Sequence, residues 1–230
     1  MAASPAMSST HNHAGIGMTS ARTRDRLVQS LREQGITDAR VLEQMRNLPR
    51  HIFVDEALSS RAYENTALPI GWGQTISQPF IVARMTEALL QGSAGRMLGK
   101  VLEIGSGCGY QTAMLSPFAE RIFAIERVEP LVKRAKQNLA ELEIRNVRLK
   151  HGDGFKGWPT QAPFDAIVVA AAPLSLPESL VQQLAPGGRL IVPVGAEGKQ
   201  QLLRLTRREN GVHKELLGPV AFVPLLAGVT

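Results

Sequence analysis

Three glycines at alternate positions, Gly105, Gly107 and Gly109, follow an apolar run that starts at Val101. This order is typical of a buried strand that turns directly into a helix, where the lack of side chains lets a ligand touch the backbone. A dinucleotide-binding turn spaces its last glycine three residues after the second, whereas here the gap is two. The turn also contains no Lys or Arg to meet a diphosphate. We therefore expect a nucleoside ligand without phosphates.

Acidic residues follow two later apolar segments. Glu126 ends the next segment along the chain, where a carboxylate can accept two ribose hydroxyls. Asp153 lies in the run His151-Gly-Asp-Gly154 and could accept an adenine amino group, or form an ordinary turn. S-adenosylmethionine fits this description of the ligand.

Two further loops concern the group that accepts the methyl. Enzymes that methylate nitrogen usually carry Asp or Asn before two prolines and an aromatic residue, whereas the segment 170–173 reads Ala-Ala-Ala-Pro. A carboxylate or hydroxyl acceptor is therefore favoured, and the irregular loop 67–79 is expected to bind it. In that loop, Ser77 could orient the acceptor or cap the next helix. Trp72 could shield the pocket from water or simply pack.

The elements that position these loops can be predicted from hydrophobic periodicity. Helices are expected at residues 22–34, 38–48, 55–63, 80–90, 110–117, 129–142 and 177–184, and strands at 100–104, 121–126, 147–151, 164–170 and 189–194. Residues 202–208 and 212–223 are expected to form an antiparallel hairpin around an Asn-Gly turn. This alternation predicts a doubly wound, Rossmann-like α/β sheet, mostly parallel, with a C-terminal antiparallel hairpin and an N-terminal helical segment.

Composition limits the other possibilities. The 230 residues carry a net charge of +6, but the arginines between Arg22 and Arg50 are spread among acidic and apolar residues, which favours a solvated surface over a nucleic-acid face. A single cysteine, Cys108, is compatible with the cytoplasm and is interpreted as a small packing residue. No apolar run is long enough to span a membrane. Residues 1–18 are expected to be a disordered leader in which His11 and His13 form no metal site, and residues 19–230 a single globular domain: a helical segment and active-site loop at 19–79, and the core at 80–230.

The chain resembles the protein-L-isoaspartate O-methyltransferases of bacteria. The resemblance is carried by Ile70-Gly-Trp-Gly-Gln-Thr-Ile-Ser-Gln-Pro79, by the glycine turn at 105–111, by His151-Gly-Asp-Gly154 and by Phe222-Val-Pro-Leu225, in that order. It covers residues 19–227, and Met18 matches the usual start of the bacterial members. Cys108 departs from the Ser or other small residue that is usual there.

The resemblance implies an enzyme that methylates the free carboxylate of L-isoaspartyl, and less well D-aspartyl, residues in damaged proteins. The ester then cyclises to a succinimide, which begins repair. It also implies an altered order of the last strands of the sheet. Ser77 would be the active-site serine, with the substrate held by Thr75, Ser77, Val223, Pro224 and Leu225. The cofactor would be contacted by Thr75, Ile76, Glu103, Gly105, Ser106, Gly107, Gly109, Gln111, Thr112, Glu126, Asp153 and Gly154.

Two other functions stay open from the residues alone. The chain could methylate a small carboxylic acid or RNA, although RNA binding would need a concentrated basic groove. It could also be a nucleoside-binding protein without activity, although such a protein has no use for an acceptor loop. We expect isoaspartyl proteins and peptides as partners of a cytoplasmic monomer, and no nucleic acid, membrane or metal.

Overall fold

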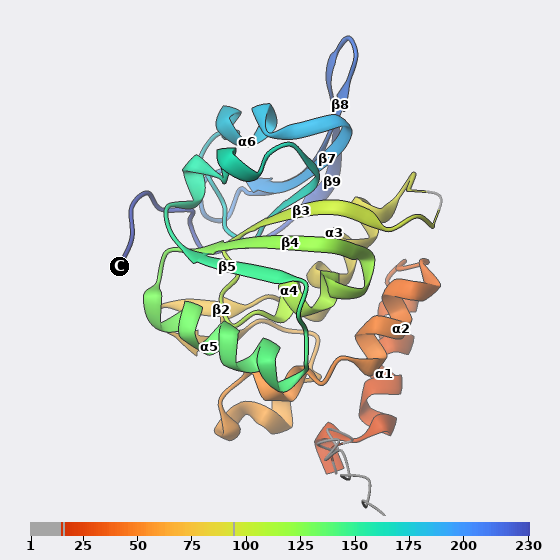
Figure 1. Cartoon of the computed structure of the whole chain (residues 1–230). Helices are drawn as coiled ribbons and strands as arrows, with labels where there is room; N and C mark the ends of the chain where they lie inside the picture. Colours follow the sequence, from red (N-terminus) through yellow and green to blue (C-terminus); the bar gives the residue numbers. More distant parts are fainter. Residues whose placement is uncertain (1–14, 16, 94) are drawn as a thin grey trace, which may run out of the picture.

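The structure is a computed structural model, and it describes residue 15, residues 17–93 and residues 95–230. A seven-stranded sheet crosses the molecule in the order β5-β4-β3-β6-β7-β8-β9 (Figure 1). Its strands are β3 (Leu98–Ile104), β4 (Ala119–Glu126), β5 (Val147–His151), β6 (Phe164–Val169), β7 (Leu184–Val194), β8 (Gln201–Arg208) and β9 (Gly211–Pro219). Strands β3 to β7 pair in parallel and the last two pair antiparallel. The predicted sheet is confirmed.

Six α-helices accompany the sheet in the described residues. They are α1 (Ala21–Glu33), α2 (Ala39–Asn47), α3 (Pro79–Leu90), α4 (Tyr110–Leu115), α5 (Glu129–Glu141) and α6 (Glu178–Gln182). Asp38 caps α2, as the sequence predicts, by accepting a hydrogen bond of 2.9 Å from the Arg40 backbone N–H. The helix predicted at 55–63 is instead a short 3₁₀ helix, Glu56–Arg61. Figure 1 shows α4 and α5 on one side of the sheet and α6 on the other.

Alternation along the strands sends side chains to two buried layers. Val101 and Ile122 pack with the N-terminal helices and with α3, α4 and α5, whereas Leu102 and Phe123 pack with α6 on the opposite face. All four side chains are at most 1% exposed. A parallel sheet needs such cover on both faces because its strands are apolar throughout. The sheet is therefore buried on both faces, and the loops at the ends of its strands lie outside these layers.

Three segments differ from the prediction by more than the shifts of one or two residues seen at other element ends. The loop 67–79 contains a hairpin of β1 (Leu68–Gly71) and β2 (Gln74–Ile76). Three consecutive residues with positive φ close this hairpin, and its strands are too short to show a clear alternation of buried and exposed residues. Strand β7 starts at Leu184, whereas the sequence predicts a start at residue 189. A Pro-Gly-Gly run and a register shift hide the strand pattern in its first half. Strand β9 ends at Pro219, which has no N–H to donate, rather than at residue 223.

The expected disordered leader lies almost wholly outside the described residues, and so do His11 and His13. Of the leader, only Gly15, Gly17 and Met18 are described, and the last two belong to a 3₁₀ helix, Gly17–Thr19. Within the described part of the chain, no helix is both long and apolar enough to cross a bilayer.

Candidate active site

The carboxyl ends of β3, β4 and β6 meet at one cavity, as expected for an open parallel sheet. Its wall includes Gly105 and Gly107 from the turn after β3, Glu126 from the end of β4, and Gly154 and Ala170 from the loops after β5 and β6. The loops that follow β3, β4, β5 and β6 therefore converge at this cavity. Arg127, which no pattern in the sequence indicates, also lines this cavity.

The three glycines of the turn all have left-handed backbone conformations. Their φ angles are +83° at Gly105, +53° at Gly107 and +88° at Gly109, a region that other residues adopt only with strain. A Cβ on Gly109 would lie 3.3 Å from the Cβ of Ala135 in α5. Gly109 is outside the cavity lining and precedes α4 directly. The first two glycines thus expose backbone to the cavity, and the third lets α4 and α5 pack closely.

Glu126 ties the turn to the neighbouring strand. Its side chain accepts hydrogen bonds from the backbone N–H groups of Gly107, at 2.9 Å, and Val128, at 3.0 Å. The two bonds use different carboxylate oxygens, so each oxygen keeps a further acceptor position. Because Glu126 is 5% exposed and lines the cavity, it is suited to accept the two hydroxyls of a ribose.

Four predicted cofactor contacts lie behind the turn rather than on the cavity wall. Thr112 donates to Glu103 at 2.5 Å, and both side chains are fully buried. Gln111 donates to Thr86 at 3.0 Å, and the buried Ser106 hydroxyl has no partner among the described residues. Burial raises the pKa of Glu103 to about 8, so this carboxyl is mostly neutral at pH 7. The contacts of these four residues with the cofactor stay predictions.

Asp153 binds backbone groups on two sides. Its carboxylate accepts from Phe155 N–H at 2.9 Å and from Gly228 N–H at 3.0 Å, and it is not part of the cavity wall. Its neighbour Gly154 is on the wall, but a Cβ there would overlap Cγ2 of Ile104. The glycine is therefore required by packing. The contact of Asp153 with adenine stays a prediction.

A second cavity of about 480 Å³ adjoins the first. Ser77 and Thr66 line it on one side and Phe222 on the other. The two cavities share three lining residues, Thr75, Ala170 and Val223. Ile76 is buried between the strands and lines neither cavity. Ligands bound in the two cavities would therefore contact each other next to the three shared residues.

Ser77 is half-buried and does not cap α3. The residue in the N-cap position is Gln78, because Pro79 begins the helix, so the interpretation of Ser77 as a cap is wrong. Its carbonyl accepts a hydrogen bond of 2.7 Å from Arg50. Its hydroxyl has no hydrogen-bond partner in the described part of the chain. The serine thus has a fixed backbone and a hydroxyl available to a ligand.

Arg50 does not lie on the solvated surface that the sequence predicts for it. The side chain is fully buried, with its guanidinium 4.7 Å from the centre of the Tyr110 ring. It donates to the carbonyls of Ala62, at 2.9 Å, and Ser77, and forms no ion pair with a described residue. Its burial lowers its pKa. The only signal in the sequence is an arginine beside Pro49 and an apolar segment, which is too common to be diagnostic.

The C-terminal segment forms the opposite wall of the second cavity. The Ala172 N–H donates to Val223 and the Leu225 N–H donates to Ala172, both at 2.8 Å. The buried Gln200 amide donates to the Phe222 carbonyl at 2.9 Å and accepts from its N–H at 2.6 Å. Val223, Pro224 and Leu225 all line the cofactor cavity, and Val223 also lines the second one. Nothing in the sequence pairs Gln200 with this segment.

Two side chains of the conspicuous loops have no place in the cavities. Trp72, at the tip of the β1–β2 hairpin, is 56% exposed and lines neither cavity. Cys108 is buried, and burial raises the pKa of its thiol to about 11. A neutral, buried thiol is unreactive, which confirms its interpretation as a packing residue.

Comparisons with known proteins match these features. Residues 22–230 match the family model described as protein-L-isoaspartate(D-aspartate) O-methyltransferase. Proteins named protein-L-isoaspartate O-methyltransferase from Halorhodospira halophila (strain DSM 244 / SL1) and Pseudomonas syringae pv. tomato are 55% and 57% identical, over 94% and 92% of this chain and 97% and 99% of theirs.

A solved structure has the same fold. It is a protein-L-isoaspartate O-methyltransferase beta-aspartate methyltransferase from Plasmodium falciparum, in complex with S-adenosyl-L-homocysteine. It is 28% identical, with a TM-score of 0.75, and the match covers 88% of this chain and 98% of that one. The chain described here belongs to the protein-L-isoaspartate(D-aspartate) O-methyltransferase family.

Proposed function

We propose that this enzyme uses S-adenosylmethionine to methylate the free α-carboxylate of L-isoaspartyl residues, and less well the side-chain carboxylate of D-aspartyl residues, in damaged proteins. The observation that carries the proposal is the pair of adjoining cavities that share only Thr75, Ala170 and Val223. The cofactor cavity lies on one side of this junction and the cavity lined by Ser77 lies on the other. In a member of this family, such an arrangement suits the transfer of a methyl group from the cofactor to the acceptor.

The residues of the first cavity fit the cofactor. Glu126 would accept the ribose hydroxyls, and the backbone at Gly105 and Gly107 would lie against the ligand. When bound, S-adenosylmethionine supplies an electrophilic methyl group on a sulfonium. The cavity measures only about 50 Å³, whereas ligand pockets usually measure about 300 Å³ or more. The wall of the cavity would therefore have to open for the cofactor to enter.

The residues of the second cavity fit a carboxylate acceptor. A carboxylate is ionised at neutral pH, so its attack on a methyl group needs no general base. We assign the Ser77 hydroxyl to the orientation of this carboxylate, with its backbone fixed by Arg50. Holding two reactants in line can lower a barrier by about 7–11 kcal/mol. The alanines at 170–172 provide an apolar boundary that excludes water from the junction.

The methyl ester would then cyclise to a succinimide without further help from the enzyme, and hydrolysis would return some normal aspartyl linkage. We also propose that the enzyme works as a monomer in the cytoplasm. Its single cysteine is compatible with a reducing compartment.

The proposal is tested by incubation with methyl-labelled S-adenosylmethionine and a pair of peptides that differ only in Asp or isoAsp. We expect base-labile methyl ester on the isoAsp peptide and background label on the Asp peptide. A total RNA sample and a mixture of small carboxylic acids serve as competing acceptors. Labelling of either competitor in preference to the isoAsp peptide would contradict the proposal.

A further inference from the structure

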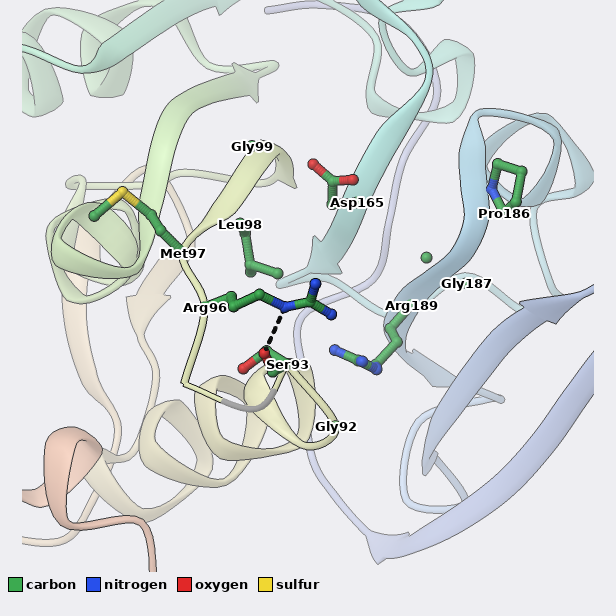
Figure 2. Close-up of a pocket in the computed structure, with 11 residues that line it drawn as sticks. Gly92, Ser93, Arg96, Met97, Leu98, Gly99, Asp165, Pro186, Gly187 and Arg189 are labelled. Atoms are coloured by element: carbon green, nitrogen blue, oxygen red, sulfur yellow. Dashed lines mark hydrogen bonds between the residues drawn. The ribbon is translucent and has the colours of Figure 1, made fainter.

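A third cavity, of about 470 Å³, lies at the opposite end of the sheet from the two described above (Figure 2). It is lined by the start of β3, the start of β6 and the Pro-Gly-Gly run of β7, together with the loop that follows α3. Parallel strands begin here, so nothing in this cavity can reach the glycine turn directly. Its polar groups have no part in the proposed methyl transfer.

Arg189 enters this cavity from β7 without a carboxylate partner. It donates to the carbonyl of Leu89 at 2.6 Å, near the end of α3, and forms no ion pair with any described residue. Partial burial lowers its pKa, and the nearby positive charge of Arg204 adds to this effect. Gly92 leaves room for the guanidinium, since a Cβ there would lie 3.1 Å from Nη2. An anion in the cavity would relieve this uncompensated charge.

Two further groups of the α3–β3 loop line the same cavity. The guanidinium of Arg96 points toward that of Arg189 in Figure 2, and Arg96 likewise has no ion pair among the described residues. Within the described structure, the Arg96 side chain makes a single long hydrogen bond, of 3.4 Å, to the carbonyl of Ser93. The Ser93 side chain is 7% exposed, and its hydroxyl has no hydrogen-bond partner in the described structure. Two cations and a buried, unpaired hydroxyl thus line one space.

Asp165 adds an acceptor to this otherwise cationic cavity. One of its oxygens accepts the Lys100 backbone N–H at 2.7 Å, which leaves the other available. A carboxylate repels a fully deprotonated oxyanion but accepts a hydrogen bond from an oxyanion that still carries a proton. We propose that this cavity binds inorganic hydrogenphosphate, held by Arg96, Arg189 and the Ser93 hydroxyl and selected by Asp165. The turn at Gly187 and Gly188 gives the anion a wall without side chains.

The test is calorimetry on the full chain at pH 7, with sodium phosphate and sodium sulfate at equal ionic strength. We expect phosphate to bind and sulfate to bind at least about tenfold more weakly, because sulfate has no proton to donate to Asp165. Arg96→Ala should weaken phosphate binding by about tenfold to a hundredfold. The Arg96 side chain is exposed, so this variant should fold. Arg26→Ala, which removes an exposed charge outside the cavity, is the matched control.

Two further variants separate the parts of the proposal. Ser93→Ala should weaken phosphate binding without lowering the melting temperature, since the hydroxyl has no described partner to lose. Asp165→Asn keeps an acceptor for Lys100 and should reduce the preference for phosphate over sulfate. Absence of phosphate binding, equal binding of sulfate, or equal losses in Arg96→Ala and Arg26→Ala would each overturn the proposal. Methyl transfer to the isoAsp peptide is measured separately and does not depend on these outcomes.

Discussion

The two halves of the active site are built in different ways. The cofactor half is local: one strand, one turn and the residue that ends the next strand provide Gly105, Gly107 and Glu126. The acceptor half joins segments far apart in the chain, since Ser77 faces residues 219–223 across the second cavity. The local half relies on backbone geometry, whereas the other half relies on long-range hydrogen bonds from Arg50 and Gln200.

Each half also rests on one buried ionisable group, and the two groups are opposite in kind. Glu103 lies beneath the glycine turn and is mostly neutral at pH 7 because burial raises its pKa to about 8. Arg50 lies beneath the acceptor loop and stays charged, because guanidinium groups are not deprotonated in proteins. A buried charge is tolerated here because backbone carbonyls and the Tyr110 ring surround it. The halves should therefore respond differently to mutation and to pH.

The largest expected effect is that of Glu126→Ala on the cofactor half. The variant loses two charge-assisted hydrogen bonds to ribose, each worth about 1.5–3 kcal/mol, so cofactor affinity should fall about a hundredfold or more. Calorimetry with S-adenosylhomocysteine measures this loss, and Glu126→Gln, which keeps one acceptor oxygen, should lose less. Unchanged affinity in a folded Glu126→Ala protein would remove Glu126 from the cofactor site.

Ser77→Ala should affect the acceptor half alone. Loss of one orienting donor should lower the rate of isoAsp-peptide methylation by about 10²–10³-fold, with little change in cofactor affinity. The melting temperature should hardly change, because the hydroxyl neither caps α3 nor bonds another described residue. Ser77→Thr, which keeps a hydroxyl, should recover part of the rate. Near-normal turnover of Ser77→Ala would contradict the assigned role.

The neutral state of Glu103 predicts a pH dependence of stability. Because its pKa in the folded state exceeds its ordinary value of 4.5, its contribution is complete below pH 4.5 and is lost as the pH rises to about 8. This loss should be on the order of a few kcal/mol. Urea unfolding of the ligand-free protein at pH 5, 7 and 9 should show a smaller decline for Glu103→Gln than for the wild type. Parallel declines would show that Glu103 is charged in the folded protein at pH 7.

Gln200→Leu should give the smallest effect. Without the two hydrogen bonds to Phe222, the wall formed by residues 219–223 should loosen and raise the KM for the isoAsp peptide severalfold, about 1 kcal/mol in binding. Cofactor affinity should change less than peptide KM. The control is Gln201→Leu, one position along β8, whose side chain makes no described hydrogen bond. Equal KM values for the two variants would show that Gln200 does not support the acceptor wall.

Sequence alone determined the features that depend on short-range pattern. Periodicity identified the five parallel strands, α1 to α3 and the terminal hairpin, because burial imposes its period on neighbouring residues. Spacing also identified the glycine turn, whose positive φ angles require glycine at each position. Glu126 was predictable because it ends a strand that pairs directly with the strand before the turn. Boundaries failed at 55–63, 67–79, 184–189 and 219–223, where glycine, proline or short alternation hides the period.

Only the tertiary structure determined which residues of distant segments lie close to one another. It placed Glu103, Ser106, Gln111 and Thr112 behind the turn, excluded Trp72 from both cavities and buried Arg50 beneath Ser77. It also brought Gln200 to Phe222, and Arg96 to the cavity of Arg189. The pairs Arg50 and Ser77, Gln200 and Phe222, and Arg96 and Arg189 are 27, 22 and 93 positions apart in the chain. Local pattern carries no information about such pairs, because their contacts depend on how whole elements pack against one another.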